Sequence, residues 1–166
     1  MILKYTFIGI CAIMMTLIPD KAISMTKKFE GFKAKPYTCP AGKLTIGYGH
    51  VIRKLDKLKQ LTEDDATELL VKDLEISFDT IDRNVAVYLT QNQLSALVSL
   101  VHNIGSGNFV NSTLLKKLNS GDYNGASKEF KRWNRVNGKV MDGLTIRREE
   151  EYKCFITPDE IETIKK

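Results

Sequence analysis

Residues 30–50 have the sequence EGFKAKPYTCPAGKLTIGYGH, which differs from the sequence on either side of it. The helical repeat of apolar residues that precedes the stretch stops at Gly31, and turn-forming residues then alternate with apolar ones. These residues are Pro36, Pro40, Gly42, Gly47 and Gly49, interleaved with Tyr37, Leu44, Ile46 and Tyr48. Short strands joined by tight turns have this composition. The stretch therefore predicts a small β-hairpin region.

An amphipathic helix is predicted immediately before this region, over residues 20–31. Ala22, Met25 and Phe29 recur on one face of it, and Gly31 is a common residue at a helix end. Glu30 therefore lies in the last helical turn, where the negative end of the helix dipole disfavours a second negative charge. Burial in a cleft would favour the protonated form of such a carboxyl group further.

Longer helical segments are predicted after the hairpin region. Thr62 can cap a helix whose first turn carries Asp64 and Asp65, and apolar residues then repeat at helical spacing from Ala66 to Ile81. Further helices are predicted from residue 90 onward, and over residues 113–118, 125–133 and 144–155. A small β-containing part joined by a helix to a larger helical part is an α+β fold. A cleft between two such parts is a natural site for a polymer substrate.

Composition excludes several classes of protein. The chain has 166 residues, of which 43% are hydrophobic and 27% charged, as in a soluble globular domain rather than a disordered one. Its net charge of +5 suits an acidic partner such as the bacterial wall, an anionic membrane or nucleic acid. The three cysteines and two histidines (Cys11, Cys39, Cys154, His50 and His102) form no CxxC pair and no zinc-ligand spacing. We therefore expect no metal and no cofactor.

Residues 1–19 are predicted to be an export signal or signal-anchor. Lys4 precedes an apolar run over residues 5–18, which is shorter than the roughly 20 residues of a transmembrane helix and ends at Pro19. A buried N-terminal core helix is the alternative. The chain is thus divided into residues 1–19, a domain over residues 20–157 and a tail over residues 158–166. A small-residue cleavage site over residues 22–24 would cut into the predicted helix, so an earlier cut, or none, is expected.

The spacing of Glu30, Cys39 and Thr45 resembles the active-site signature of the phage lysozymes, glycoside hydrolase family 24. That signature is a glutamate, eight residues, an aspartate or cysteine, five residues, and a threonine in a TIGxGH context. The segments LTQNQLSALVSLVHNIG, STLLKKLNSGDYNGASKEFKRW and GKVMDGLTIRREEE also match, so the resemblance covers most of residues 20–155. It implies a lysozyme-like fold with a hairpin lobe, a helical lobe and a cleft between them. It also implies hydrolysis of the β-1,4 bond between N-acetylmuramic acid and N-acetylglucosamine in peptidoglycan, which lyses bacterial cells.

The resemblance gives each signature residue a role. Glu30 is expected to be the general acid, and the hydroxyl of Thr45 to help place the attacking water. Cys39 stands where many members have an aspartate. A cysteine thiol titrates near pH 8.5, so it is a poorer base than a carboxylate but a better soft nucleophile. Both roles stay open for Cys39, as does inversion or retention at the sugar.

Supporting residues follow from the same resemblance. An arginine, either Arg147 or Arg148, is expected beside Glu30, where it would hold the carboxylate and favour its ionised form. His50 is expected to be structural, tied to an acidic residue of the next helix. His102 replaces an apolar residue that is common in the family, and no role is assigned to it. Cys154 and Trp133 are expected in the core.

The implied partners are peptidoglycan glycan chains and, through the N-terminal segment, the inner membrane. No nucleic-acid partner is expected, and the enzyme is expected to be a monomer. Export to the periplasm follows, by an initial tether or a cleaved signal. Family members of the signal-arrest-release kind have segments rich in Gly and Ala, whereas this one is rich in Ile, Leu and Met. A disulfide at Cys39 could hold the enzyme inactive, and thiol exchange involving Cys11 could restore its activity once the segment leaves the bilayer. Alternatively, Cys11 is an apolar anchor residue.

The same residues are compatible with two other functions. A cysteine-dependent peptidoglycan peptidase or amidase would use Cys39 as nucleophile and His50 as base. Such enzymes favour a cysteine at a helix N-terminus, whereas Cys39 is followed by Pro40 and Gly42. A non-catalytic wall-binding relative is the second alternative, and the intact set of Glu30, Cys39 and Thr45 argues against it.

Overall fold

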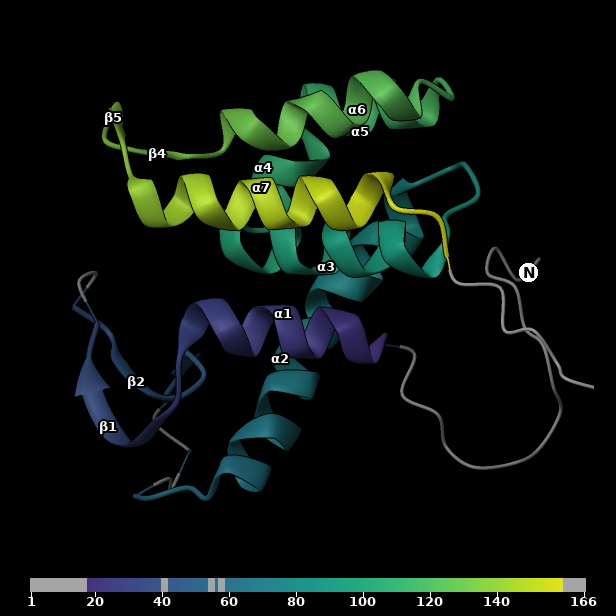
Figure 1. The fold of residues 1–166 in the computed structure, drawn as a ribbon. Coiled ribbons are helices and arrows are strands. Elements are labelled where there is room, and N and C mark those ends of the chain that lie inside the picture. Colours follow the sequence, from purple (N-terminus) through teal and green to yellow (C-terminus); the bar gives the residue numbers. More distant parts are fainter. Residues whose placement is uncertain (1–17, 40–41, 54–55, 57–58, 160–166) are drawn as a thin grey trace, which may run out of the picture.

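The computed structural model describes residues 18–39, 42–53, 56 and 59–159. A three-stranded antiparallel sheet lies at one end of a group of helices (Figure 1). The α+β prediction is therefore confirmed. The expected export segment falls almost entirely on residues 1–17, Cys11 included, and these lie outside the described residues. Within the described ranges, no helix is both long and apolar enough to cross a bilayer.

Helix α1 covers Asp20–Glu30 and ends, as predicted, before Gly31. On the predicted face, Ala22 is buried and Met25 and Phe29 are half-buried. Thr26 is also buried on this side of the helix, which the prediction did not include. The Thr26 hydroxyl donates to the Ala22 carbonyl at 2.8 Å. This bond satisfies a polar group inside the core, which a pattern of apolar residues alone does not anticipate.

The small sheet has the strand order β1-β2-β3. The strands are β1 (Lys33–Thr38), β2 (Leu44–Gly47) and β3 (His50–Val51). A tight turn joins β1 to β2: the Cys39 carbonyl accepts from the Gly42 N–H at 2.8 Å, and the Cys39 N–H donates to the Lys43 carbonyl at 2.9 Å. The predicted strands and turns are therefore present.

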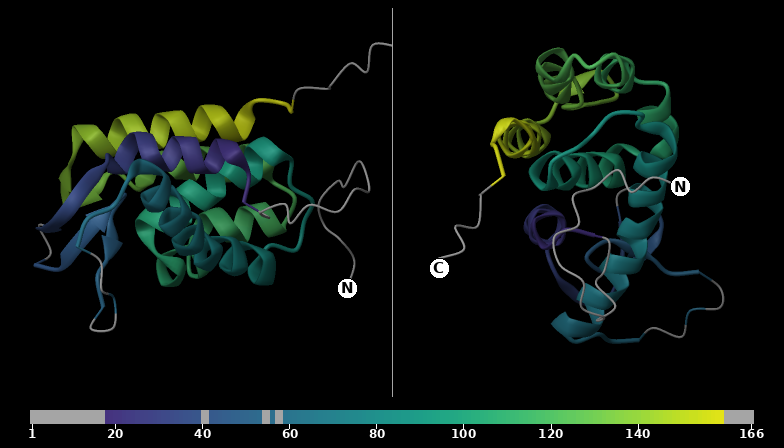
Figure 2. Two further views of the ribbon diagram at one scale, coloured as in Figure 1. Left: turned by 90° about the horizontal axis from the view of Figure 1, so that it is seen from below. Right: turned by 90° about the vertical axis from the view of Figure 1, so that its right-hand side faces the viewer.

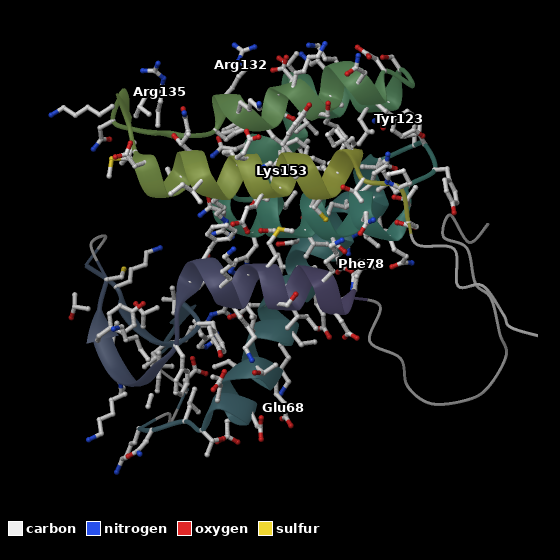
Figure 3. All side chains as sticks on the ribbon, viewed as in Figure 1. Glu68, Phe78, Tyr123, Arg132, Arg135 and Lys153 are labelled. Carbon is white, nitrogen blue, oxygen red and sulfur yellow. The ribbon has the colours of Figure 1, made fainter. Side chains whose placement is uncertain are left out.

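Helix α2 (Glu63–Asn84) joins the sheet to the other helices. Thr62 and Asp65 cap its start reciprocally: each side chain accepts from the other residue's N–H, at 3.1 and 3.0 Å. One side of α2 is exposed and the other is buried, with Glu68 and Phe78 as examples (Figure 3). The long amphipathic helix predicted from Thr62 onward is thus confirmed.

The remaining helices form a larger lobe around α3, which packs against α1, α2 and α7 (Figure 2). Its elements are α3 (Gln91–Ile104), α4 (Ser106–Val110), α5 (Thr113–Asn119), α6 (Tyr123–Glu129), the 3-10 helix η1 (Phe130–Arg132), the hairpin strands β4 (Arg135–Val136) and β5 (Lys139–Val140), and α7 (Asp142–Ile156). The β4–β5 hairpin was not predicted, although Asn137-Gly138 is a strong hairpin-turn dipeptide. Cys154 is buried, as expected, and Trp133 is half-buried against the core.

A single side chain joins the ends of α1, α3 and α7 that lie away from the sheet. The Asn92 amide oxygen accepts from Lys21 Nζ at 2.7 Å, and its amide nitrogen donates to the Pro158 carbonyl at 2.9 Å. The Asp159 carboxylate accepts from the Gln91 and Asn92 N–H groups at 2.7 and 2.9 Å. Pro158 and Asp159 therefore pack with the helical lobe.

Candidate active site

A cleft of about 480 Å³ opens between strand β3 and the helical lobe. Its described lining comes from the end of α1, the start of β3, the middle of α2 and the end of α3. The titratable and charged members of that lining are Glu30, His50, Arg53, Asp73 and His102. Acid–base chemistry on a bound polymer is possible in such a cleft.

Glu30 is the last residue of α1, and its side chain is 25% exposed. Its Oε1 accepts from Arg147 Nη1 at 2.7 Å. The other oxygen, Oε2, faces Gly49, where an added Cβ would lie 3.5 Å from it. Gly49 has a φ of 89°, which side chains other than that of glycine rarely allow. The turn before β3 therefore approaches the carboxylate closely because this position is glycine.

Arg147 is the arginine that meets Glu30. It is buried on α7, where its Nε donates to Glu151 Oε1 at 3.1 Å and its Nη2 to the Ser99 carbonyl at 3.2 Å. The guanidinium carbon lies 5.4 Å from the centre of the Phe29 ring. Each side of the guanidinium therefore has a partner, and the group is fixed before any substrate binds.

Arg148 points away from Glu30 into the helical lobe. Its Nη1 donates to Asn103 Oδ1 at 3.0 Å and its Nη2 to Glu151 Oε1 at 2.8 Å. Burial lowers the pKa of Arg148, and the Glu151 charge opposes that shift. Burial likewise raises the pKa of Glu151, against the effect of the two guanidinium groups. Sequence reasoning missed Glu151, although its spacing from Arg147 and Arg148 is that of helical neighbours.

His50 contacts an acidic residue of the following helix, as predicted. Its Nδ1 lies 2.9 Å from Asp73 Oδ2, and its Nε2 lies 3.6 Å from Asp56 Oδ2. His102, which had no assigned role, is half-buried and lines the cleft. Burial lowers the pKa of His102; the negative charges of Glu30 and Asp73 oppose this shift, and Arg147 reinforces it.

Cys39 and Thr45 are not among the described residues that line this cleft. Thr45 is buried on β2, opposite Val51, which does line it. The Thr45 hydroxyl donates to the Lys43 carbonyl at 2.9 Å. Cys39 is half-buried at the start of the β1–β2 turn. The structure thus brings together Glu30, Arg147 and His50, with the other two signature residues on the adjoining hairpin.

Comparison with known proteins identifies the family. A model of the phage lysozymes matches residues 27–151. This chain belongs to the phage lysozyme family. The lysozyme is 43% identical over 142 residues to the endolysin of Acyrthosiphon pisum secondary endosymbiont phage 1. The matched region covers 83% of this chain and 97% of that endolysin. It is 41% identical over 122 residues to a SAR-endolysin of Bacteriophage PS119, with 74% and 73% covered.

Solved structures agree with this assignment. A crystal structure of P22 lysozyme superposes with a TM-score of 0.78 at 35% identity, covering 86% of this chain and 100% of that one. The protein is thus a glycoside hydrolase that lyses peptidoglycan, and the predicted lysozyme-like fold, enzyme class and activity are confirmed. Peptidoglycan is its substrate.

Proposed function

We propose that Glu30 is the general acid that cleaves the β-1,4 bond between N-acetylmuramic acid and N-acetylglucosamine. One observation supports this most: in the cleft, Glu30 Oε1 lies 2.7 Å from the buried guanidinium of Arg147. A glycosidase acid must give a proton to the leaving oxygen and then exist as a carboxylate. Arg147 would stabilise that carboxylate once the proton has left, through its hydrogen bond to Oε1.

In the proposed reaction, protonated Glu30 gives its proton to the oxygen that joins the two sugars. The bond between that oxygen and the anomeric carbon breaks, and positive charge develops on the anomeric carbon and the ring oxygen. Water supplies the new hydroxyl of the product, and its second proton leaves to a base. The products are a new reducing end and a free hydroxyl on the next sugar.

Thr45 and Cys39 would serve the opposite side of the sugar. The Thr45 hydroxyl donates its proton to the Lys43 carbonyl, so its oxygen is available to accept a hydrogen bond from the attacking water. A water held in this way would direct a lone pair toward the sugar. Cys39 has two possible chemistries. As a base it takes the proton of the attacking water and the sugar inverts; as a thiolate nucleophile it forms a thioglycosyl intermediate and the sugar is retained.

His50 and Arg148 would support the site by holding its walls in place. His50 holds β3 to α2 through Asp73, which fixes one wall of the cleft. Arg148 holds Asn103, a residue of the opposite wall. Neither side chain is required to exchange a proton with the sugar in this proposal.

The test compares the purified protein with Glu30→Gln and Cys39→Ser on peptidoglycan. New reducing ends that disappear in Glu30→Gln support the proposal, with a fall of about 10²–10⁴-fold expected for loss of a general acid. New amino groups that disappear only in Cys39→Ser would instead support a cysteine peptidase or amidase. The absence of cleavage by any of the three proteins would support a wall-binding relative. Proton NMR of the first product formed distinguishes an inverted from a retained anomer.

The N-terminal segment is proposed to deliver a monomeric lysozyme to the periplasm, first tethered to the inner membrane. The likeness to a SAR-endolysin supports the tether. The domain is proposed to include α1 and the residues just before it, because Ile18 and Ala22 are both buried in the core. The mass of the periplasmic protein tests this: an N-terminus after Ser24 would contradict it, since that cut removes the first turn of α1.

A further inference from the structure

A continuous set of contacts between charged and polar side chains connects two residues of the cleft lining through the interior of the helical lobe. It begins at Glu30, passes through Arg147 to Glu151, and continues through Arg148 to Asn103. Each successive contact measures 2.7, 3.1, 2.8 and 3.0 Å. Glu30 and Asn103 both line the cleft, whereas the three residues between them are almost completely shielded from solvent.

Glu151 is the charge that the two arginines share. Its Oε1 accepts three hydrogen bonds, from Ser99 Oγ at 2.7 Å, Arg147 Nε and Arg148 Nη2. Its Oε2 lies 2.8 Å from Arg148 Nε as an ion pair. An oxygen that accepts from two guanidinium groups and a hydroxyl belongs to an ionised carboxylate. Arg147, Arg148 and Glu151 then carry two positive charges and one negative charge, and Glu30 is the most solvent-accessible of the four side chains.

We infer that Glu151 is a positioning residue that sets the pH range in which Glu30 acts as an acid, through Arg147. The inference rests on the proposed role of Glu30. Arg147 offers one nitrogen to Glu30 and another to Glu151, so the charge of Glu151 offsets part of the attraction between Arg147 and the Glu30 carboxylate. Without that offset, Glu30 would release its proton more readily and fail as an acid at a lower pH.

Other titratable and charged groups near Glu30 also face the cleft. His102 on α3, His50 on β3 and Asp73 on α2 line the same cleft, together with Arg53. None of them is in the set of contacts that joins Arg147 to Glu151 and Arg148. A change at Glu151 therefore acts on Glu30 through the buried arginines and leaves these cleft groups in place.

The experiment measures kcat/KM for peptidoglycan hydrolysis from about pH 4 to pH 9. In Glu151→Gln the alkaline limb of the kcat/KM profile should move to lower pH by about one pH unit, which is within the range that a neighbouring charge produces. In Arg148→Gln it should move the other way, because the charge of Glu151 then acts on Arg147 alone. Glu150→Gln is the matched control: it removes the same charge from the preceding residue, which pairs with the exposed Lys28, and should leave the profile in place.

The opposite signs separate this inference from a merely structural role, which would lower activity at every pH and move neither limb. An unmoved alkaline limb in a folded Glu151→Gln protein overturns the inference. Where that variant fails to fold, Glu151→Asp should show a smaller shift of the same sign, and Arg148→Gln still tests the opposite one. Full activity of Glu30→Gln would overturn the proposed function instead, so the two failures are distinguishable.

Discussion

The two walls of the cleft are held by different kinds of contact. On the helical wall, Glu30 is held by Arg147, which lies in a network with Glu151 that solvent does not reach. On the sheet wall, His50 is held by Asp73, and these side chains are 14% and 24% exposed. Breaking a buried ion pair costs far more than breaking an exposed one. The proposed acid is therefore held by the more deeply buried of the two anchors, although its own side chain is 25% exposed.

Arg147→Met tests the helical wall and should have the largest effect. It leaves Glu151 with a single arginine and Glu30 with none, so we expect a loss of about 3–5 kcal/mol in the free energy of unfolding. Denaturant unfolding measures it. The control is Arg132→Met, at the outer edge of the helical lobe (Figure 3) and 71% exposed, which should change stability by less than about 1 kcal/mol. Equal losses in both variants would mean that the two ion pairs are equivalent.

Gly49→Ala tests the point where the two walls meet. The φ of 89° should cost about 1–3 kcal/mol of stability for a residue with a side chain, and the new methyl group would contact the Glu30 carboxylate. We expect lower kcat/KM as well as a lower unfolding midpoint. Gly143→Ala, in the first turn of α7 with no atom near its Cβ, should be neutral or stabilising. Unchanged activity of the Gly49 variant would show that the turn can move away from Glu30.

Asp73→Asn tests the sheet wall alone. It removes the charge that faces His50 Nδ1, with an expected loss of about 1–2 kcal/mol. The matched control is Asp79→Asn on the same helix, an exposed partner of Arg83 at 3.5 Å, for which less than about 0.5 kcal/mol is expected. Thermal unfolding distinguishes them. A loss from Asp73→Asn as large as that from Arg147→Met would remove the difference between the walls.

His102→Leu should have the smallest effect, visible only as a dependence on pH. Burial lowers the pKa of His102 below 6.5, so the folded state binds fewer protons than the unfolded state. The stability that neutral His102 contributes is therefore present above about pH 6.5 and is lost as the pH falls. Unfolding midpoints between pH 7 and pH 5 should decline less in the leucine variant. Identical declines in both proteins would contradict this.

Helix caps and turn-forming residues made the ends of α1 and α2 and the hairpin predictable from the sequence. Gly31 ends α1 and so places Glu30 at the cleft, Thr62 caps α2, and the Pro and Gly residues of the hairpin set its turns. Family resemblance placed His50 against an acidic residue and an arginine against Glu30. The sequence left open which arginine that would be, because Arg147 and Arg148 are adjacent on one helix and only the packing of α7 on α3 decides which faces α1.

The network behind Glu30 was not predictable by the same rules. Glu151 lies among charged residues and has the pattern of a solvated helix face, yet it is fully buried. Its burial depends on Ser99, which is 52 residues earlier in the sequence. The hydroxyls of Thr26 and Ser99 likewise occupy core positions that an apolar repeat does not identify. Polar groups that satisfy one another inside a core are a tertiary property, and sequence periodicity does not report them.

The contacts of Asn92 have a consequence for how the chain folds as it is made. Asn92 accepts from Lys21, which lies 71 positions earlier, and donates its N–H to Asp159, which lies 67 positions later. A chain that emerges N-terminus first can form α1, the sheet and α2 early, but the first turn of α3 gains its carboxylate cap only when residue 159 is available. The order of synthesis therefore leaves the start of α3 without this carboxylate until Asp159 has been made, although Glu30 is made 129 residues before it.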